Sequence, residues 1–348
     1  MSGKEIPEDI LLSCVDMYYK IGSEQGAAKA LNLSRSTYRH RLMTARKKGL
    51  MDEGVVETDT YKKNILPPSD EPIEDIIDHL TSRYESRKSH VDAKQWQRVT
   101  MKSDEPIGLL WFGDPHLDDN FCDWPVLRSH VDLVKNNDGV YGCGLGDYQN
   151  NWIGRLSRLY AEQDTSHHTA WRLVEWFVRE INPLILIGGN HDMWSGPGDP
   201  LQWMTEPHTI NEDWSAQIAI EFPNGQECKI HAAHDMPGHS QWNPLHGQKK
   251  MAMFRSNAHL YIAGHKHNWE LAQMEQVEEG HVSWLARARG YKAHDTYAMV
   301  RGYEEQNFGQ AILQVINPKT KTPEGFSHCF VDVETGVEFL NYLRSSTK

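Results

Sequence analysis

Five short groups of aspartate, asparagine and histidine residues stand out in this 348-residue sequence, because each follows a short apolar run. Apolar runs that end in glycine or histidine are typical of buried strands, so the polar residues are expected at strand ends. In chain order the motifs are Gly113-Asp114-Pro115-His116, Gly146-Asp147, Gly189-Asn190-His191-Asp192, His231-Ala232-Ala233-His234-Asp235 and Gly264-His265-Lys266-His267. Carboxylate, imidazole and amide groups together form a ligand set for divalent ions such as Mn, Fe or Zn.

The spacing within the motifs supports a shared metal site. In an extended segment, residues two apart point the same way, so His265 and His267 can reach the same ions. The neighbouring glycines let the backbone turn sharply and approach closely. A single Gly-Asp or Gly-His-x-His motif is usually a turn or a surface loop, but five in succession after apolar runs predict one site.

The elements that must position these motifs belong to an α/β domain. Apolar runs predict strands at 107–112, 140–145, 184–187, 230–233 and 260–263, and later strands at 281–286, 311–316, 329–333 and 337–343. A helix is expected at 170–181, between two of these strands. Active-site residues at the carboxyl ends of strands are what open α/β sheets favour.

In this order, the motifs resemble those of the calcineurin-like metallophosphoesterase superfamily: D-x-H, G-D, G-N-H-D/E, a lone histidine and G-H-x-H. The resemblance covers about residues 105–345 and matches all five blocks. It implies an α/β fold of the calcineurin-like phosphoesterase type, a β-sandwich flanked by helices. It also implies two divalent ions, with Mn expected first and Fe, Zn or Mg as alternatives.

The resemblance assigns ligands to both ions. It implies Asp114, His116 and His267 for one ion, Asn190, His265 and a lone histidine for the other, and Asp147 as the bridge. His234 is preferred as the lone histidine because it ends its strand. His231, inside the same strand, is the alternative.

The same resemblance implies a hydrolytic mechanism. Two close divalent ions lower the pKa of a shared water and clamp the phosphoryl oxygens. His191 faces the scissile phosphate and acts as the general acid toward the leaving oxygen. Asp192 and Asn150 are expected to orient His191. The sequence contains neither the G-x-S-x-G motif of serine hydrolases nor a P-loop.

One departure from the superfamily pattern bears on the substrate. Protein phosphatases of this superfamily carry G-D-x-x-D-R, whereas residues 146–151 here read GDYQNN and lack the second aspartate and the arginine. This difference favours the diester-cleaving or nuclease-like branches. Asn150, Arg155 and Arg289 are predicted to contact the substrate.

The first 50 residues predict a helix-turn-helix. Helical spacing of apolar residues, the stop signal Gly22 and the capping residues Ser23 and Ser34 indicate three short helices. The third helix, 35–48, is basic, and its predicted DNA-binding residues are Arg35, Arg39, Arg41 and Lys47. The segment has nine Lys/Arg and five Asp/Glu, a net charge of +4. Because the whole chain has a net charge of −12, the rest of the chain carries −16. Contact with DNA is therefore expected here, and a basic helix in a protein-interaction bundle is the alternative.

Composition shifts divide the chain into three segments. We expect a helix-turn-helix domain at 1–50, a linker with a connecting helix at 51–101, and a metallophosphoesterase domain at 102–348. No apolar run is long enough for a membrane helix, and the N-terminus lacks a signal-peptide pattern, so we expect a cytoplasmic protein without membrane association. Five scattered cysteines form no C-x-x-C pair.

Three functions remain in view. The favoured one is a metal-dependent DNA nuclease or phosphodiesterase, similar to DNA-repair-exonuclease-type phosphoesterases of bacterial or phage origin. The second is a phosphatase or phosphodiesterase for small nucleotides or phosphoproteins. The third is a non-enzymatic DNA-binding regulator with a structural metal site. The sequence does not predict the oligomeric state.

Overall fold

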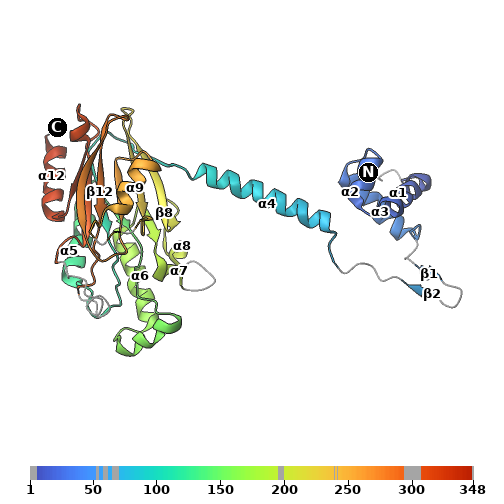
Figure 1. Cartoon of the computed structure of the whole chain (residues 1–348), viewed down its shortest axis with the longest axis horizontal. Helices are drawn as coiled ribbons and strands as arrows, with labels where there is room; N and C mark the ends of the chain where they lie inside the picture. Colours follow the sequence, from blue (N-terminus) through green and yellow to red (C-terminus); the bar gives the residue numbers. More distant parts are fainter. Residues whose placement is uncertain are drawn as a thin grey trace. The chain divides into compact units, whose positions relative to one another are not determined.

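The computed structural model describes residues 6–51, 55–57, 62–64, 70–194, 200–238, 240, 242–293 and 307–346 (Figure 1). The chain forms two compact units, Met1–Asp92 and Ala93–Lys348. Parts of the predicted linker, including Pro67 and Pro68, lie outside the described residues. Among the helices that the structure describes, none has the length and apolar character needed to cross a membrane.

The N-terminal unit begins with three helices, α1 (Glu8–Ile21), α2 (Glu24–Ala30) and α3 (Arg35–Lys47). Gly22 ends α1 in the left-handed conformation, and the Ser23 and Ser34 side chains cap the next two helices, as the sequence predicted. The Tyr38 hydroxyl donates to the Cys14 carbonyl at 2.6 Å, tying α3 to α1. Small and apolar residues fill the space between the helices: Leu11, Cys14, Ala27, Ala28, Tyr38 and Leu42.

The basic residues of α3 differ in their surroundings. Arg39 and Lys47 are exposed and Arg41 is half-buried. Arg35 instead pairs with Asp75 and, at 3.5 Å, with Asp78. The DNA-binding role of these residues stays a prediction.

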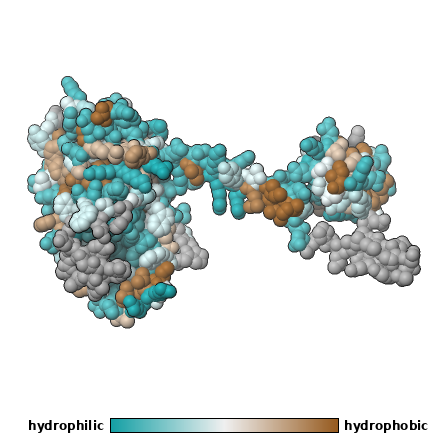
Figure 2. Space-filling model, viewed as in Figure 1, coloured by the Kyte–Doolittle hydropathy of each residue, from teal (hydrophilic) through white to brown (hydrophobic). Residues whose placement is uncertain are grey.

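The rest of the N-terminal unit contains a two-stranded ribbon and a long helix. Strands β1 (Val55–Glu57) and β2 (Lys62–Asn64) pair antiparallel, and helix α4 spans Ile73–Ala93. Figure 2 shows apolar side chains gathered mainly toward the N-terminal end of α4, on a helix that is otherwise largely hydrophilic. The exposed apolar residues of this helix are Ile73, Ile77, Leu80, Tyr84 and Val91.

Two mixed six-stranded sheets build the C-terminal unit. The first sheet has the order β14-β13-β4-β5-β6-β7, with β4 to β7 parallel and β13 antiparallel to β4. Its strands are β4 (Ile107–Phe112), β5 (Val140–Gly144), β6 (Ile185–Gly188), β7 (Ile210–Asp213), β13 (Ala311–Ile316) and β14 (Ser327–Phe330).

The second sheet has the order β11-β12-β10-β9-β8-β3. Strands β9, β10 and β12 are parallel, and β8 runs antiparallel to β9. The strands are β3 (Gln97–Thr100), β8 (Ser215–Glu221), β9 (Glu227–Ala233), β10 (Leu260–Ala263), β11 (Glu270–Gln276) and β12 (His281–Arg287).

The sheets pack face to face, and helices cover their outer faces. Between the sheets, Leu109 and Trp111 of β4 share one core with Ile218, Ile230 and Ile262 of the second sheet. Helices α5 (Trp124–Asn136), α6 (His167–Ile181) and α12 (Val333–Ser345) pack on the first sheet, and α9 (His246–Phe254) packs on the second. The short helices are η1 (Gly154–Glu162), α7 (Asn190–Met193), α8 (Pro200–Met204) and α11 (Pro323–Phe326). The chain is thus an α/β protein with a sandwich-like pair of mixed sheets and an N-terminal helical region.

One predicted strand is wrong. Residues 337–343 lie in helix α12, not in a strand after a turn at 334–336. The Asp332 side chain accepts a hydrogen bond from the Thr335 amide at 3.1 Å and caps this helix. Buried Val333, Val337 and Leu340 then repeat at helical spacing. Strands β3, β7, β8 and β11 were not predicted from the sequence. Of these, β3, β7 and β11 are largely polar and only partly buried.

Candidate metal centre

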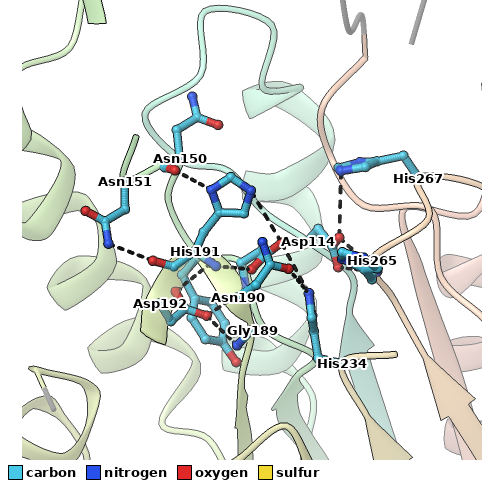
Figure 3. Close-up of polar contacts among 12 residues, drawn as sticks. Asp114, Asn150, Asn151, Gly189, Asn190, His191, Asp192, His234, His265 and His267 are labelled. Atoms are coloured by element: carbon cyan, nitrogen blue, oxygen red, sulfur yellow. Dashed lines mark hydrogen bonds and ion pairs between the residues drawn. The ribbon is translucent and has the colours of Figure 1, made fainter. Parts of the chain in front are cut away.

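The five motifs meet at one edge of the paired sheets (Figure 3). From the first sheet, Asp114 and His116 follow β4, Asp147 follows β5, and Asn190 follows β6. From the second sheet, His234 follows β9, and His265 and His267 follow β10. Because β4, β5 and β6 are parallel to one another, as are β9 and β10, their carboxyl ends bring these loops together.

The potential ligand atoms form three overlapping groups. Within each group the atoms lie within 4.8 Å of one another. The groups are Asp114–Asp147–His234–His265, Asp114–His116–His267 and His116–Asp147–His191. Asn190 joins the first group, because its Oδ1 lies 2.9 Å from His234 Nε2, which is also 3.2 Å from Asp147 Oδ2. Two carboxylates shared among histidine groups are suited to a pair of metal ions.

His116 gives an independent reason to place a metal here. Its side chain is 2% exposed, and neither ring nitrogen has a hydrogen-bond partner. Buried imidazole nitrogens are normally satisfied, and leaving them without a partner is unfavourable. The donor set of carboxylates, imidazoles and an amide fits a divalent ion, which would satisfy His116.

The backbone at the site is held in an unusual conformation. Eight non-glycine residues of the described part of the chain have positive φ, and four of them are predicted ligands: His116, Asp147, His265 and His267. Such residues are uncommon and cluster at functional sites, where the surrounding structure maintains the strain. Gly146, with φ +98°, allows the close approach, since a Cβ there would lie 2.7 Å from His234 Nδ1.

The electrostatics of the site favour added positive charge. Burial raises the pKa of Asp114 to about 7 and lowers the pKa of His116 well below its ordinary value. Burial alone would also raise the pKa of Asp147, but the adjacent His234 imidazole outweighs it and holds that pKa below its ordinary range. The same pairing overcomes burial and raises the pKa of His234 to about 10. Divalent ions would supply the positive charge that these carboxylates attract.

His191 lies beside the ligands with one ring nitrogen engaged. His191 Nδ1 donates to the Asn150 carbonyl oxygen, which can only accept, so the proton sits on Nδ1. Nε2 is directed toward Asp147, with Oδ2 3.9 Å away. The ring centroids of Trp152 and Trp194 lie 5.3 Å and 4.3 Å from the centroid of the His191 ring, so the two tryptophans flank it.

Asp192 holds two loops of the site together. Its carboxylate accepts hydrogen bonds from the backbone amides of Asp147 at 2.7 Å, Gly189 at 2.8 Å and Tyr148 at 3.1 Å. The Asn150 carbonyl contacts the His191 ring directly, and the orienting role of Asp192 stays a prediction. Asp192 fixes the loop after β5 against the loop after β6.

The three predicted substrate-binding residues occupy different environments. Asn150 is buried, and its side chain donates to Asp119 Oδ2 at 2.9 Å, within the protein. Arg155 is exposed in η1. Arg289 is 4% exposed, and its amide donates to the Gly309 carbonyl at 2.7 Å. Substrate contact by these residues stays a prediction.

His231 lies in a separate environment from the ligand groups. Its Nδ1 is 3.0 Å from Ser256 Oγ, and burial lowers its pKa to about 4. None of the three groups found among the described residues contains it. The geometry therefore favours His234 as the lone histidine of the motif.

A buried arginine, Arg287, braces two of the loops that carry candidate ligands. Arg287, 2% exposed, donates to Asp235 Oδ1 from two nitrogens at 3.2 Å and to the carbonyls of Pro244 and Gly264. Asp235 directly follows His234, and Gly264 directly precedes His265. Residue type alone does not reveal that an arginine after a strand is buried, so the sequence did not predict this role.

Comparisons with known proteins add little to this geometry. No protein-family model matches the chain, and no curated protein matches it. Among solved structures, the chain is similar to the protein of unknown function AQ665 from Aquifex aeolicus, at 16% identity and a TM-score of 0.24. That match covers 46% of this chain and 78% of AQ665. A likeness at this score has no bearing on function, so the site geometry has to carry the functional argument.

Proposed function

We propose that this chain is a two-metal phosphoesterase that hydrolyses phosphodiester bonds, with DNA as its substrate. The observation that carries the proposal is the overlap of the three ligand groups through Asp114 and Asp147, around a buried His116 whose nitrogens have no other partner. Asp114, His116 and His267 would hold one ion, and Asn190, His234 and His265 the other, with Asp147 between them. Bound there, the ions would activate a water molecule and stabilise charge on the phosphoryl oxygens.

The chain's own residues supply the proton transfer. Water attacks phosphorus and gives up a proton to the solvent, the bond to the leaving oxygen breaks, and that oxygen needs a proton. His191 donates it from Nε2, because Nδ1 is occupied by the Asn150 carbonyl. That carbonyl also stabilises the imidazolium form of His191 before the proton leaves. The two tryptophans flanking the ring limit its rotation.

Two features support a nucleic-acid diester as the substrate. The segment after Asp147 lacks the aspartate and arginine that the protein phosphatases of the resembled superfamily carry. The N-terminal unit carries a basic helix, α3, whose residues Arg39 and Lys47 are exposed. A basic helix after a short turn is suited to contact a duplex.

The test compares hydrolysis of bis(4-nitrophenyl) phosphate, 4-nitrophenyl phosphate, and single- and double-stranded DNA, with Mn²⁺ added. We expect cleavage of the diester and of DNA, and a loss of at least about a hundredfold in Asp147→Asn and His191→Ala. His231→Asn is the matched control, because it alters a buried histidine of β9 that faces Ser256. It should retain activity.

Each other result favours a different function. Hydrolysis of the monoester alone would indicate a phosphatase for small nucleotides or phosphoproteins. No turnover despite bound metal would indicate a DNA-binding regulator. Equal loss of activity in His231→Asn and His191→Ala would contradict the assignment of the site residues.

A further inference from the structure

Trp214 is the one residue between two consecutive strands that belong to different sheets. It follows β7 of the first sheet and precedes β8 of the second. Its amide donates to the Gly188 carbonyl at 3.0 Å, and its carbonyl accepts from the His234 amide at 2.8 Å. The Trp214 backbone is thereby fixed between the strand that leads to Asn190 and the strand that carries His234.

The crossing demands a conformation that tryptophan adopts poorly. Trp214 has φ +65°, in the left-handed region that glycine occupies without strain. For a bulky residue this conformation is a genuine outlier. Trp214 is 49% exposed, so about half of it is open to a ligand while the rest packs on the protein. The turn itself does not require a tryptophan.

The ring lies beside the metal centre. Its centroid is 6.4 Å from that of His234, whose Nε2 belongs to the ligand group with Asp147 and Asn190. A half-exposed aromatic ring therefore lies beside one of the candidate metal ligands. Strain maintained next to a candidate active site points to a role for the side chain.

We infer that Trp214 stacks on an unpaired nucleobase adjacent to the scissile phosphodiester, so that the substrate at the site is single-stranded. This inference rests on the proposed phosphodiesterase function. Base–aromatic stacking tolerates any sequence, because every base has a π-face. Bases in a duplex are already stacked on their neighbours, so Trp214 selects strands whose bases are free.

Binding of two short strands tests the inference. One is a dye-labelled pentathymidylate, and the other has the same phosphates but abasic tetrahydrofuran residues. Affinities of the full chain with Mn²⁺ are measured by fluorescence anisotropy, with His191→Ala in every protein to prevent cleavage. We expect the base-containing strand to bind about tenfold or more tightly than the abasic one, and Trp214→Gly to bring this ratio close to one.

The variants separate stacking from folding. Trp214→Gly suits the positive φ and should keep the melting temperature of the parent protein. Trp214→Leu keeps apolar bulk without a π-face and should lose the ratio as well. Trp203→Ala is the matched control, because Trp203 is also exposed, at 77%, but lines a cavity together with Asn182 and Pro183. These two residues precede β6, whereas the metal site follows β6. It should keep the parent ratio.

The outcomes distinguish this inference from the proposed function. A ratio near one in the parent, or a ratio unchanged in both Trp214 variants, overturns the inference, even if the nitrophenyl diester is hydrolysed. A base-dependent ratio lost in both variants supports the inference, even if no substrate is turned over. The N-terminal unit is identical in all these proteins, so a change in the ratio from one protein to the next reports on Trp214.

Discussion

Replacing Arg287 with methionine tests whether the arginine braces the metal-binding loops. The substitution keeps apolar bulk and removes the guanidinium that contacts Asp235 and the carbonyls of Pro244 and Gly264. Because Arg287 is 2% exposed, water does not readily replace the hydrogen bonds that these partners lose. Both stability and metal affinity should fall.

The size of the loss follows from what remains around Asp235. Removing one partner of a buried ion pair costs about 3–5 kcal/mol, because the other charge is left uncompensated. The Asp235 side chain is 29% exposed and keeps Lys266 Nζ at 3.0 Å, so its charge is partly compensated. We therefore expect the low end, about 3 kcal/mol, which corresponds to a fall of roughly 6–12 °C in melting temperature for a unit of this size.

Urea unfolding and calorimetric titration with Mn²⁺ measure the two effects. Metal affinity should fall roughly 10- to 100-fold, as when groups that orient metal ligands are removed. Arg98→Met is the matched control, because Arg98 pairs with Glu221 while its side chain is 65% exposed. Exposed pairs contribute less than about 1 kcal/mol.

Two results would refute the reasoning. One is a loss of stability in Arg287→Met no larger than in Arg98→Met, which would mean that the buried pair does not brace the fold. The other is unchanged Mn²⁺ affinity despite a loss of stability. In that case the Gly264 carbonyl contact would have no influence on His265.

Three further predictions address other parts of the chain. Burial lowers the pKa of His130 to about 4, so between that value and about 6.5 the unfolded state binds more protons than the folded state. Up to about 3 kcal/mol of stability should therefore be lost as the pH falls through this window. Urea unfolding of His130→Gln should show a flatter dependence of stability on pH. Gly336→Ala should lower the melting temperature although alanine favours helices, because the added Cβ would lie 2.8 Å from Leu313 Cδ2 in the core. An unchanged or higher melting temperature would show that the Leu313 side chain moves aside to accommodate the Cβ. Arg39→Ala with Arg41→Ala should weaken duplex DNA binding and reduce the slope of log K against log salt by about 2, while nitrophenyl diester hydrolysis stays unchanged; equal slopes would rule out phosphate contacts by these arginines.

The sequence identified the loops of the candidate site because ligand chemistry is tied to residue type. Asp114, Asp147 and His265 stand at strand ends that apolar runs reveal, and parallel strands bring such ends together. The contacts around them were harder to predict. The Asn150 carbonyl on His191 is a backbone atom, which residue types do not reveal.

Errors in the fold have similar physical causes. Residues 337–343 contain enough apolar and aromatic side chains to suggest a strand, yet the Asp332 cap and the helical spacing of Val333, Val337 and Leu340 decide otherwise. Strand β11 was missed because its exposed and half-buried polar residues resemble a loop. Its pairing with β12 decides its structure, and that pairing is not a local property of the sequence.

The candidate ligands are divided between the two sheets, with Asp114, Asp147 and Asn190 on one and the histidines after β9 and β10 on the other. Ions held between them would act as cross-links, joining layers that otherwise adhere through apolar packing. The affinity for metal would then depend on the spacing of the layers, and any substitution that changes this spacing would alter the binding of both ions at once. Substitutions deep in the shared core, far from any ligand, would therefore alter metal affinity through the distance between the sheets.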